Sequence, residues 1–496
     1  MGSIAPPPAS LPPTHTHGDT APLQNDFPTP SLSRTATRTS TEQFEIEDGT
    51  EGQGQALPPV DRGRGAWGFV AAAFLLETFI WGYSYSFATI LVYFETHEPW
   101  RQQSIATLSA VGTTQLGIQF IFPLFFTVVF RRYPDYIKPV LWVSVAVNCG
   151  SMLISSWATQ VWQLIVLQGI LCGVTGAALY TPVFLWMSEW WLEKRGLASG
   201  IIFSGTGAGG FAFPFAITAL LQLSPTPSSN IGFQWMCRVW ALTTLVVFSV
   251  SLWLIGPRVK PPKRGTVKNR TPWMAGAGEI GIVGKSGVFW TMVLAALLSS
   301  LSTLPVSLNI GLYSSSLTSS ALKRELSVSL FNLAASLGCF VTGYLSDFSY
   351  AHATTMCGLA GAVLALAAWG TANSLAKVYA FAVVFGFFSQ QVAAWSASAR
   401  DVVGPHQNPH TATLVFCLYS VVRGIASVCM PFVSDTLYVT GKEGIGAAWG
   451  AYGFRKMIIF VGVAAFLSAI GGIGLHYVQR AVRDKRRRAA LHGAGK

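Results

Sequence analysis

The chain has 496 residues, of which 51% are hydrophobic and only 11% are charged. Soluble domains usually carry about a quarter of charged residues, so the composition excludes a soluble globular protein and predicts that most of the chain lies in lipid. The formal net charge of +12 would suit a nucleic-acid partner, but the positions of the basic residues, described below, argue against one.

Residues 1–60 are rich in proline, serine and threonine and contain no apolar run. This composition predicts a disordered cytoplasmic tail, because such a segment cannot bury enough apolar surface to fold. The absence of an apolar run also excludes a signal peptide at this position.

From Trp67 onward, apolar runs of about twenty residues recur, the length that crosses a hydrocarbon core about 30 Å thick. Twelve such runs lie near 67–94, 104–130, 138–157, 161–188, 196–222, 236–256, 287–311, 325–346, 353–371, 375–398, 411–436 and 453–478. A basic linker over 257–286 divides them into two sets of six. We therefore expect an all-α membrane protein with pseudo-symmetric six-helix bundles over 61–256 and 287–478.

Basic residues are distributed unequally between the two sides that this topology creates. If both termini are cytoplasmic, 22 of the 33 Lys and Arg residues fall at cytoplasmic positions and 8 fall on the opposite side. The positive-inside rule therefore predicts cytoplasmic termini. The basic tail over 479–496 is interpreted as an anchor that faces anionic lipid, without a nucleic-acid partner. We expect the plasma membrane, with the vacuolar membrane as the alternative, and a monomer is compatible with the sequence.

The fourth and fifth runs meet at a short joint that carries all the charge of the segment from Tyr180 to Leu221. Charges are expected to gather in this way at a membrane interface. The fifth run is rich in small residues, which allow a helix to approach its neighbour closely: Gly200, Gly205, Gly207, Gly209 and Gly210. The letters GTGAGG within it lack the preceding strand and the Lys-Ser/Thr of a nucleotide-binding loop, so we interpret them as a packing surface.

Several segments resemble the major facilitator superfamily, and in particular its fungal monocarboxylate-permease-like branch. The most specific is YTPVFLWMSEWWLEKRGLASGIIFSGTGAGG, with its Tyr-x-Pro, acidic-aromatic pair and Arg-Gly-Leu-Ala-x-Gly. FRRYPDYIKPVLW and VTGYLSDFS are similar to the loop segments of the two halves. The resemblance covers nearly everything after residue 60, and it implies a major facilitator fold and transport by alternating access.

Two features depart from the proton-coupled lactate transporters of this family. Those transporters use a lysine in the first helix and an Asp-Arg pair in the eighth. Here the first helix has no lysine, and the eighth, LSVSLFNLAASLGCFVTGYL, has no charge before Asp347. The lactate mechanism is therefore not transferred to this chain.

Glu77 and Arg423 are ionisable residues deep within predicted spans. Such residues cost at least about 2.5–3.5 kcal/mol to insert and normally face a cavity. Trp81 and Tyr85 follow Glu77 at helical spacing and share a face with it. We expect Glu77 to accept a proton and Arg423 to hold an anionic group, because a guanidinium can bind a carboxylate in two places. The alternative is that both are buried partners of polar groups that join helices.

Further polar or amphipathic residues within spans are candidates for the cavity wall: Tyr180, Asn309, Asn332, Gln390, Gln391, Trp395 and Tyr419. Each of them could equally be an interhelical hydrogen-bonding residue. Asp347, Glu193 and Arg195 lie at the cytoplasmic ends of predicted helices, where charge pairs can form in one state and break in the other. Simple interfacial anchoring is the alternative for these residues.

The sequence predicts no catalytic site, metal site or cofactor. The eight histidines do not cluster, and the seven cysteines all fall within apolar runs without paired spacing, as expected for small buried hydrophobes. We therefore expect a secondary transporter of a small organic molecule, with a monocarboxylate or related organic acid as the leading substrate class and proton coupling as a hypothesis. The alternative is efflux of a fungal secondary metabolite or toxic compound.

Overall fold

A computed structural model describes residues 58–191, 194–259, 278, 280–281, 283–403, 409–439 and 449–493. Nearly all of the predicted N-terminal tail and most of the linker over 257–286 therefore lie outside the described residues, as does Glu193. The boundaries proposed for the tail, linker and two halves stay predictions.

The apolar runs form long α-helices, and the described residues contain no strand. The first half comprises α1 (Arg64–Tyr85), α2 (Phe87–Thr96), α3 (Ile105–Arg132), α4 (Ile137–Ser155), α5 (Val161–Leu164), α6 (Cys172–Trp190), α7 (Arg195–Leu221) and α8 (Ile231–Leu254). The second half comprises α10 (Gly287–Ser315), α11 (Ala321–Val363), α12 (Leu375–Phe388), α13 (Trp395–Val403), α14 (Pro409–Leu437) and α15 (Arg455–Gly493). A 3₁₀ segment over Pro134–Tyr136 precedes α4, and another over Gln391–Ala394 separates α12 from α13. Segments of π-helix over Ile165–Leu171 and Leu364–Trp369 continue α5 and α11.

Eleven helical stretches of the described residues are long and apolar enough to cross a membrane. One of them, Ala321–Trp369, has 49 residues and would be about 74 Å long as a single helix, far more than a bilayer core. It contains a non-helical residue, Ser349, close to the predicted break between the eighth and ninth spans. This stretch therefore holds two spans, which confirms the prediction of twelve.

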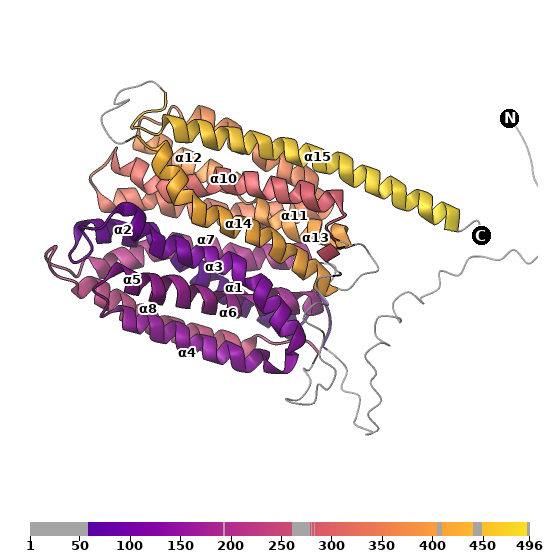
Figure 1. Ribbon diagram of the computed structural model, residues 1–496, viewed down its shortest axis with the longest axis horizontal. Helices are drawn as coiled ribbons and strands as arrows, with labels where there is room; N and C mark the ends of the chain where they lie inside the picture. The colour runs from indigo at the N-terminus through magenta and orange to yellow at the C-terminus, as the bar shows by residue number, and fades with distance from the viewer. Residues whose placement is uncertain are drawn as a thin grey trace, which may run out of the picture. The chain divides into compact units, whose positions relative to one another are not determined.

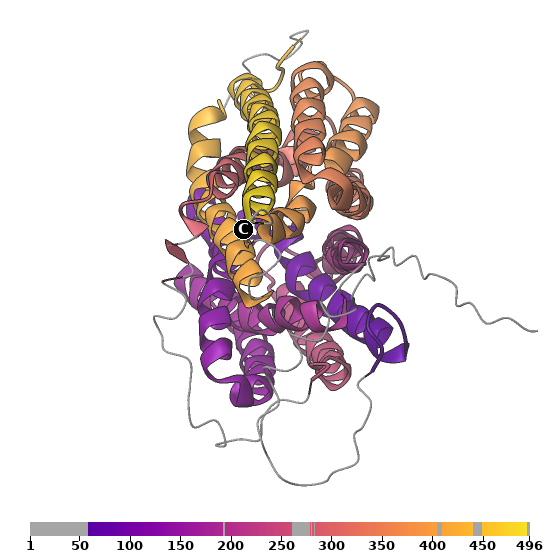
Figure 2. The ribbon, with the colours of Figure 1, turned by 90° about the vertical axis from the view of Figure 1, so that its right-hand side faces the viewer.

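The two halves pack against each other through two helix pairs, α3 against α14 and α7 against α11. These are the second and fifth spans of one half against the fifth and second spans of the other. Exchanging the halves exchanges the two pairs, as a pseudo-twofold axis requires. Figures 1 and 2 show the first half in indigo to magenta and the second in red to yellow.

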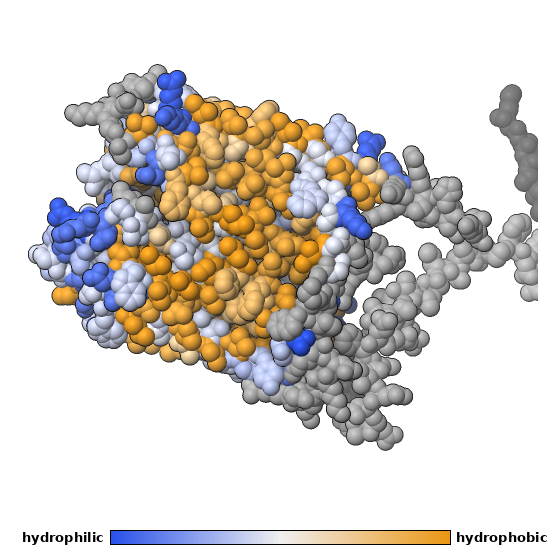
Figure 3. Space-filling model, in the orientation of Figure 1, coloured by the Kyte–Doolittle hydropathy of each residue, from blue (hydrophilic) through white to orange (hydrophobic). Residues whose placement is uncertain are grey.

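The surface of the helices is apolar between two polar ends. Figure 3 shows an orange band that covers both halves, with hydrophilic residues at the two ends of the helices. Trp235 and Trp253 are exposed near opposite ends of α8, where tryptophan commonly lies at membrane interfaces. The chain is accordingly a multi-pass membrane protein.

Below, the end of the bundle where α1 begins and α13 ends is called the proximal end, and the end where α2 ends and α11 begins is called the distal end (left in Figure 1). The sequence prediction of cytoplasmic termini would place the proximal end in the cytoplasm.

Close packing of α7 depends on its glycines. A Cβ atom at Gly205 would lie 2.6 Å from the backbone oxygen of Phe74 on α1, and one at Gly210 would lie 2.7 Å from the side chain of Asn332 on α11. Larger residues at these positions would hold the helices apart. The prediction that the glycines of this segment form a packing surface is confirmed, and α7 contacts both its own half and the other half through them.

Candidate functional site in the cavity between the halves

A cavity lies between the two halves near the middle of the helices. The empty space there is about 420 Å³, which includes space that is open to solvent. The first half contributes Tyr85 from α1 and Phe203, Thr206 and Gly207 from α7, and the second half contributes Thr303, Ser307, Phe331, Asn332, Ala335, Ser336, Cys339, Ser389, Gln390 and Arg423. Small-molecule sites are typically lined by apolar and aromatic side chains with a few placed polar groups, and this wall contains both kinds.

Arg423 is the charged residue of the cavity wall. It is only 5% exposed, and its guanidinium lies 5.4 Å from the ring centroid of Phe120 on α3. Its Nε has no hydrogen-bond partner, and no described carboxylate lies within ion-pair distance of it. A buried charge without a counter-ion is costly, so the cavity offers an anionic ligand a group that the protein itself leaves unpaired.

Glu77 lies behind the cavity wall rather than in it. The hydroxyl of Thr206, which lines the cavity, donates a 2.9 Å hydrogen bond to Oε1 of Glu77. The other carboxyl oxygen is buried without a partner, and the residue is 2% exposed. Thr206 therefore connects the carboxyl group to the cavity, a geometry that allows a proton on Glu77 to respond to what the cavity holds.

The predicted face of the first helix is only partly directed at the cavity. Tyr85 lines it, whereas Trp81 packs between Phe120 at 4.4 Å and Tyr180 at 5.2 Å between ring centroids. The indole nitrogen of Trp81 is buried without a partner.

The aromatic candidates gather on the proximal side of the cavity. The ring of Tyr180 contacts Phe184, which contacts Phe416 of the other half at 4.6 Å. Trp395 lies beside Phe416 and Tyr419. Tyr419 also stacks on Phe289 within the second half. These rings form an apolar contact between the halves, next to the cavity and not in its wall.

The amide candidates have different roles. Asn332 lines the cavity and donates to the carbonyl of Gly210 at 3.1 Å, across the two halves. Asn309 donates to Pro305 at 2.9 Å within its own helix. Gln391 accepts from Ser468 at 3.2 Å and lines a smaller cavity of about 250 Å³ inside the second half. Asn332 therefore lines the central cavity, as does Gln390, the fourth amide candidate, whereas Asn309 and Gln391 do not.

Several hydroxyl residues of the wall were missed by sequence reasoning, among them Thr303, Ser307 and Ser336. Serine and threonine are common in membrane helices, where they bond to their own backbone, as Thr303 does to Ser299. No sequence signal distinguishes those that face a cavity.

Of the predicted gating residues, Asp347 has a visible partner. Arg400 donates to it at 3.2 Å at the proximal end, with both side chains partly exposed. Next to this pair, the hydroxyl of Tyr350 donates to Asp401 at 2.6 Å. Both contacts join α11 to α13 within the second half. Arg195 begins α7, but its side chain lies outside the described part of the chain.

The joint between α6 and α7 is held at the proximal end by Glu189. Its carboxylate accepts from the backbone nitrogens of Arg258 at 2.9 Å and Val259 at 3.3 Å. Burial raises the pKa of Glu189, and these two hydrogen bonds oppose the rise. The contact fixes the start of the linker against this joint.

Comparison with known proteins agrees with this architecture. The model of the Major Facilitator Superfamily matches residues 69–431. The MFS transporter asaE of Aspergillus flavus is 26% identical over 448 residues, covering 88% of this chain and 93% of that protein. The Fujikurins efflux protein of Gibberella fujikuroi is 24% identical, covering 77% and 76%. The Aspyridones efflux protein apdF of Emericella nidulans is 29% identical over a shorter stretch, 42% and 41%. With a family match across most of its length, the chain belongs to the major facilitator superfamily and is a transporter, not an enzyme.

Proposed function

We propose that this transporter exports an amphipathic organic anion, such as an acidic secondary metabolite, and that protons move in the opposite direction. The observation that carries the proposal is Arg423, a buried guanidinium in the cavity wall without an ion-pair partner among the described residues. A carboxylate can accept two parallel hydrogen bonds from it.

The rest of the wall supports an amphipathic substrate. Hydroxyl and amide groups from Thr206, Ser307 and Asn332 accompany the rings of Tyr85 and Phe331. An inorganic ion would leave these rings without a contact, whereas an organic acid with an apolar body can contact both kinds of group.

Export is favoured over uptake by the names of the relatives. Two of them are named as efflux proteins, for fujikurins and for aspyridones. A second candidate remains, proton-coupled uptake of a monocarboxylate, because the sequence resembles that branch of the family and Glu77 is connected to the cavity through Thr206. The same site would serve either direction, and a gradient experiment distinguishes them.

The experiment is transport by purified protein in liposomes of labelled organic acids, each tested beside its own methyl ester. We expect Arg423→Gln to reduce transport of a carried acid by about tenfold or more, corresponding to about 1.4 kcal/mol. Transport of the ester should change by less than about twofold, because the ester has no charge for the guanidinium to bind.

The matched control is Arg238→Gln. Arg238 is an arginine of the first half that lies between the rings of Trp157 and Trp235, away from the cavity. It should leave transport of both compounds unchanged. Equal loss of acid and ester transport in Arg423→Gln, or no loss of either, would refute the role of Arg423 as the anion-binding group.

A further inference from the structure

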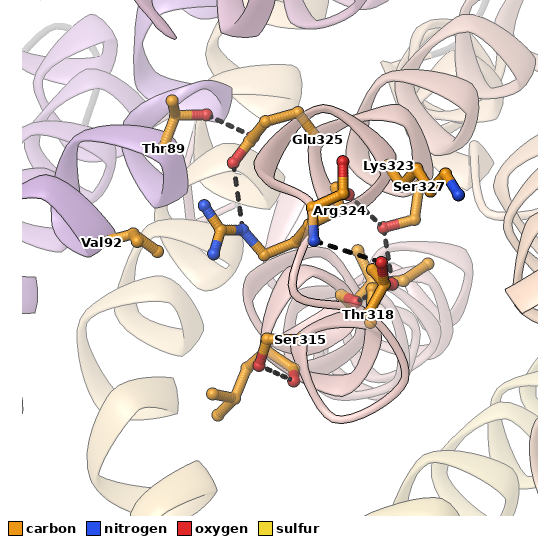
Figure 4. Close-up of polar contacts among 12 residues, drawn as sticks. Thr89, Val92, Ser315, Thr318, Lys323, Arg324, Glu325 and Ser327 are labelled. Carbon is orange, nitrogen blue, oxygen red and sulfur yellow. Dashed lines mark hydrogen bonds and ion pairs between the residues drawn. The ribbon is translucent and has the colours of Figure 1, made fainter. Parts of the chain in front are cut away.

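A buried polar contact joins the two halves at the distal end. The hydroxyl of Thr89 on α2 donates a 2.6 Å hydrogen bond to Oε2 of Glu325 at the start of α11. Both residues are buried, at 6% and 3% exposure. Figure 4 shows Glu325 reaching across to Thr89, with the side chain of Arg324 beside it. The contact links residues of opposite halves that are far apart in the sequence.

The contact belongs to the stronger class of hydrogen bonds. Hydroxyl-to-carboxylate distances of about 2.5–2.7 Å are typical of charge-assisted bonds. The second carboxyl oxygen of Glu325 is 3.3 Å from Nε of Arg324. Arg324 also attracts Glu95 near the end of α2. Its guanidinium therefore interacts with carboxylates of both halves and reinforces the contact at Thr89.

Glu325 is held rigidly on its own half. The hydroxyl of Ser314 at the end of α10 donates to Ser327 at 2.8 Å, and Ser327 donates to the carbonyl of Arg324 at 2.7 Å. The backbone nitrogen of Ser320 donates to the hydroxyl of Thr318 at 3.2 Å in the turn before α11. When the second half moves, Glu325 therefore moves with it and separates from Thr89.

The desolvation of the Glu325 carboxylate lowers the free-energy cost of breaking this contact. A buried carboxylate loses its hydration, and Thr89 and Arg324 replace only part of it. Separation of the halves at the distal end would return water to Glu325, which offsets the lost hydrogen bond. Such a contact can form and break within one cycle, unlike a large apolar interface.

We propose that Thr89, Arg324 and Glu325 form a distal gate that holds the cavity closed to the distal solution and opens once in each transport cycle. The gate depends on alternating access and not on the identity of the substrate or on Arg423, so it can be tested without a known substrate.

The test uses Cys339, a buried native thiol in the cavity wall. A membrane-impermeant methanethiosulfonate reagent is applied to vesicles of known orientation, from the distal or the proximal side, and labelling of Cys339 is followed by peptide mass spectrometry. We expect Thr89→Val to accelerate distal labelling about tenfold and to slow proximal labelling, because the population shifts toward the distally open state. A general loss of folding would raise labelling from both sides.

Thr96→Val is the matched control. Thr96 lies on α2, as Thr89 does. Its hydroxyl bonds to the carbonyls of Val92 and Tyr93 on that helix and to the ring of His97. It should behave as the unchanged protein, and Thr89→Ser should restore slow distal labelling. In the double variant Thr89→Val with Glu325→Gln, distal labelling should rise no further than in the more affected single variant, because both changes break the same contact.

Unchanged distal labelling in Thr89→Val, or an equal rise on both sides, would overturn the gate. Additive effects in the double variant would also overturn it, since they would mean that the two residues act separately.

Discussion

Arg423 and Glu77 are buried ionisable residues that have no ion-pair partner among the described residues. Both could be selected from sequence because a charge within an apolar run is costly and therefore rarely accidental. Where each side chain lies relative to the cavity could not be predicted in the same way. Arg423 lines the cavity, whereas Glu77 reaches it only through Thr206. That difference depends on how α1 is rotated against α7, which helical spacing alone does not determine.

The aromatic and amide candidates show the limit of residue-level reasoning. Polar residues within spans were chosen by residue type, and residue type does not show which way a side chain points. Asn332 faces the central cavity, whereas Asn309 donates to the carbonyl of Pro305 within its own helix and Gln391 lines a second cavity. The π-helical segments and the break between α12 and α13 rotate side chains, and no sequence pattern located them.

At the residue scale we predict that Glu77→Gln removes the dependence of transport on a pH gradient. Glutamine can still accept the hydrogen bond of Thr206 but cannot bind or release a proton at neutral pH. Gradient-driven transport in liposomes should fall by about tenfold or more, about 1.4 kcal/mol, while substrate exchange without a gradient is retained. The control is Glu98→Gln in the loop after α2. If Glu77→Gln keeps the full pH dependence, Glu77 has no part in coupling.

At the scale of elements, the helices follow closely from the sequence. Most predicted runs agree with the observed spans to within about four residues at each end. The sixth span begins five residues before its predicted start, at Ile231, and the tenth ends five residues after its predicted end, at Val403. Apolar runs of this length leave little freedom, since lipid requires every backbone group to be bonded within the helix. The contacts between helices follow less directly, because they depend on small residues whose partners are distant in sequence.

Gly207 provides the prediction at this scale. A Cβ atom there would overlap the backbone oxygen of Asn332 and lie 2.5 Å from Cβ of Ser336, both on α11. We expect Gly207→Ala to destabilise the protein by about 1–3 kcal/mol, as overpacking does, and to slow transport, because α7 and α11 form one of the two main helix pairs between the halves.

The measurement is the thermal unfolding midpoint of the purified protein together with the initial rate of transport. Gly150→Ala is the matched control, because a Cβ atom at Gly150 meets nothing within 4 Å. Gly207→Ala that is as stable and as active as Gly150→Ala would show that α7 and α11 need not approach this closely.

At the scale of the whole molecule, the two halves contact each other on both sides of the cavity. The proximal contact is apolar, through Phe184 and Phe416, and the distal contact is polar, through Thr89 and Glu325. Sequence reasoning predicted the two halves from the number of spans and the linker. It missed the distal contact, because Glu325 lies at the very start of a span, where a charge is expected in any case.

An architecture of two halves around one central site can move a substrate only by exposing that site to each side in turn. We propose that the unpaired Arg423 gives the site a preference for an anion and that Glu77, which accepts a hydrogen bond from Thr206, carries a proton. These two features fit coupled movement of an organic anion and protons in either direction, and the proposed export against entering protons rests on the names of the relatives.

The most direct test is to load purified protein in liposomes with labelled organic acids and impose a pH gradient across the membrane. The account predicts that a carried acid leaves the liposomes faster when the outer solution is acidic, and that the same gradient does not accelerate the exit of its methyl ester. Net movement of the acid in the same direction as the protons, or equal movement of acid and ester, would contradict it.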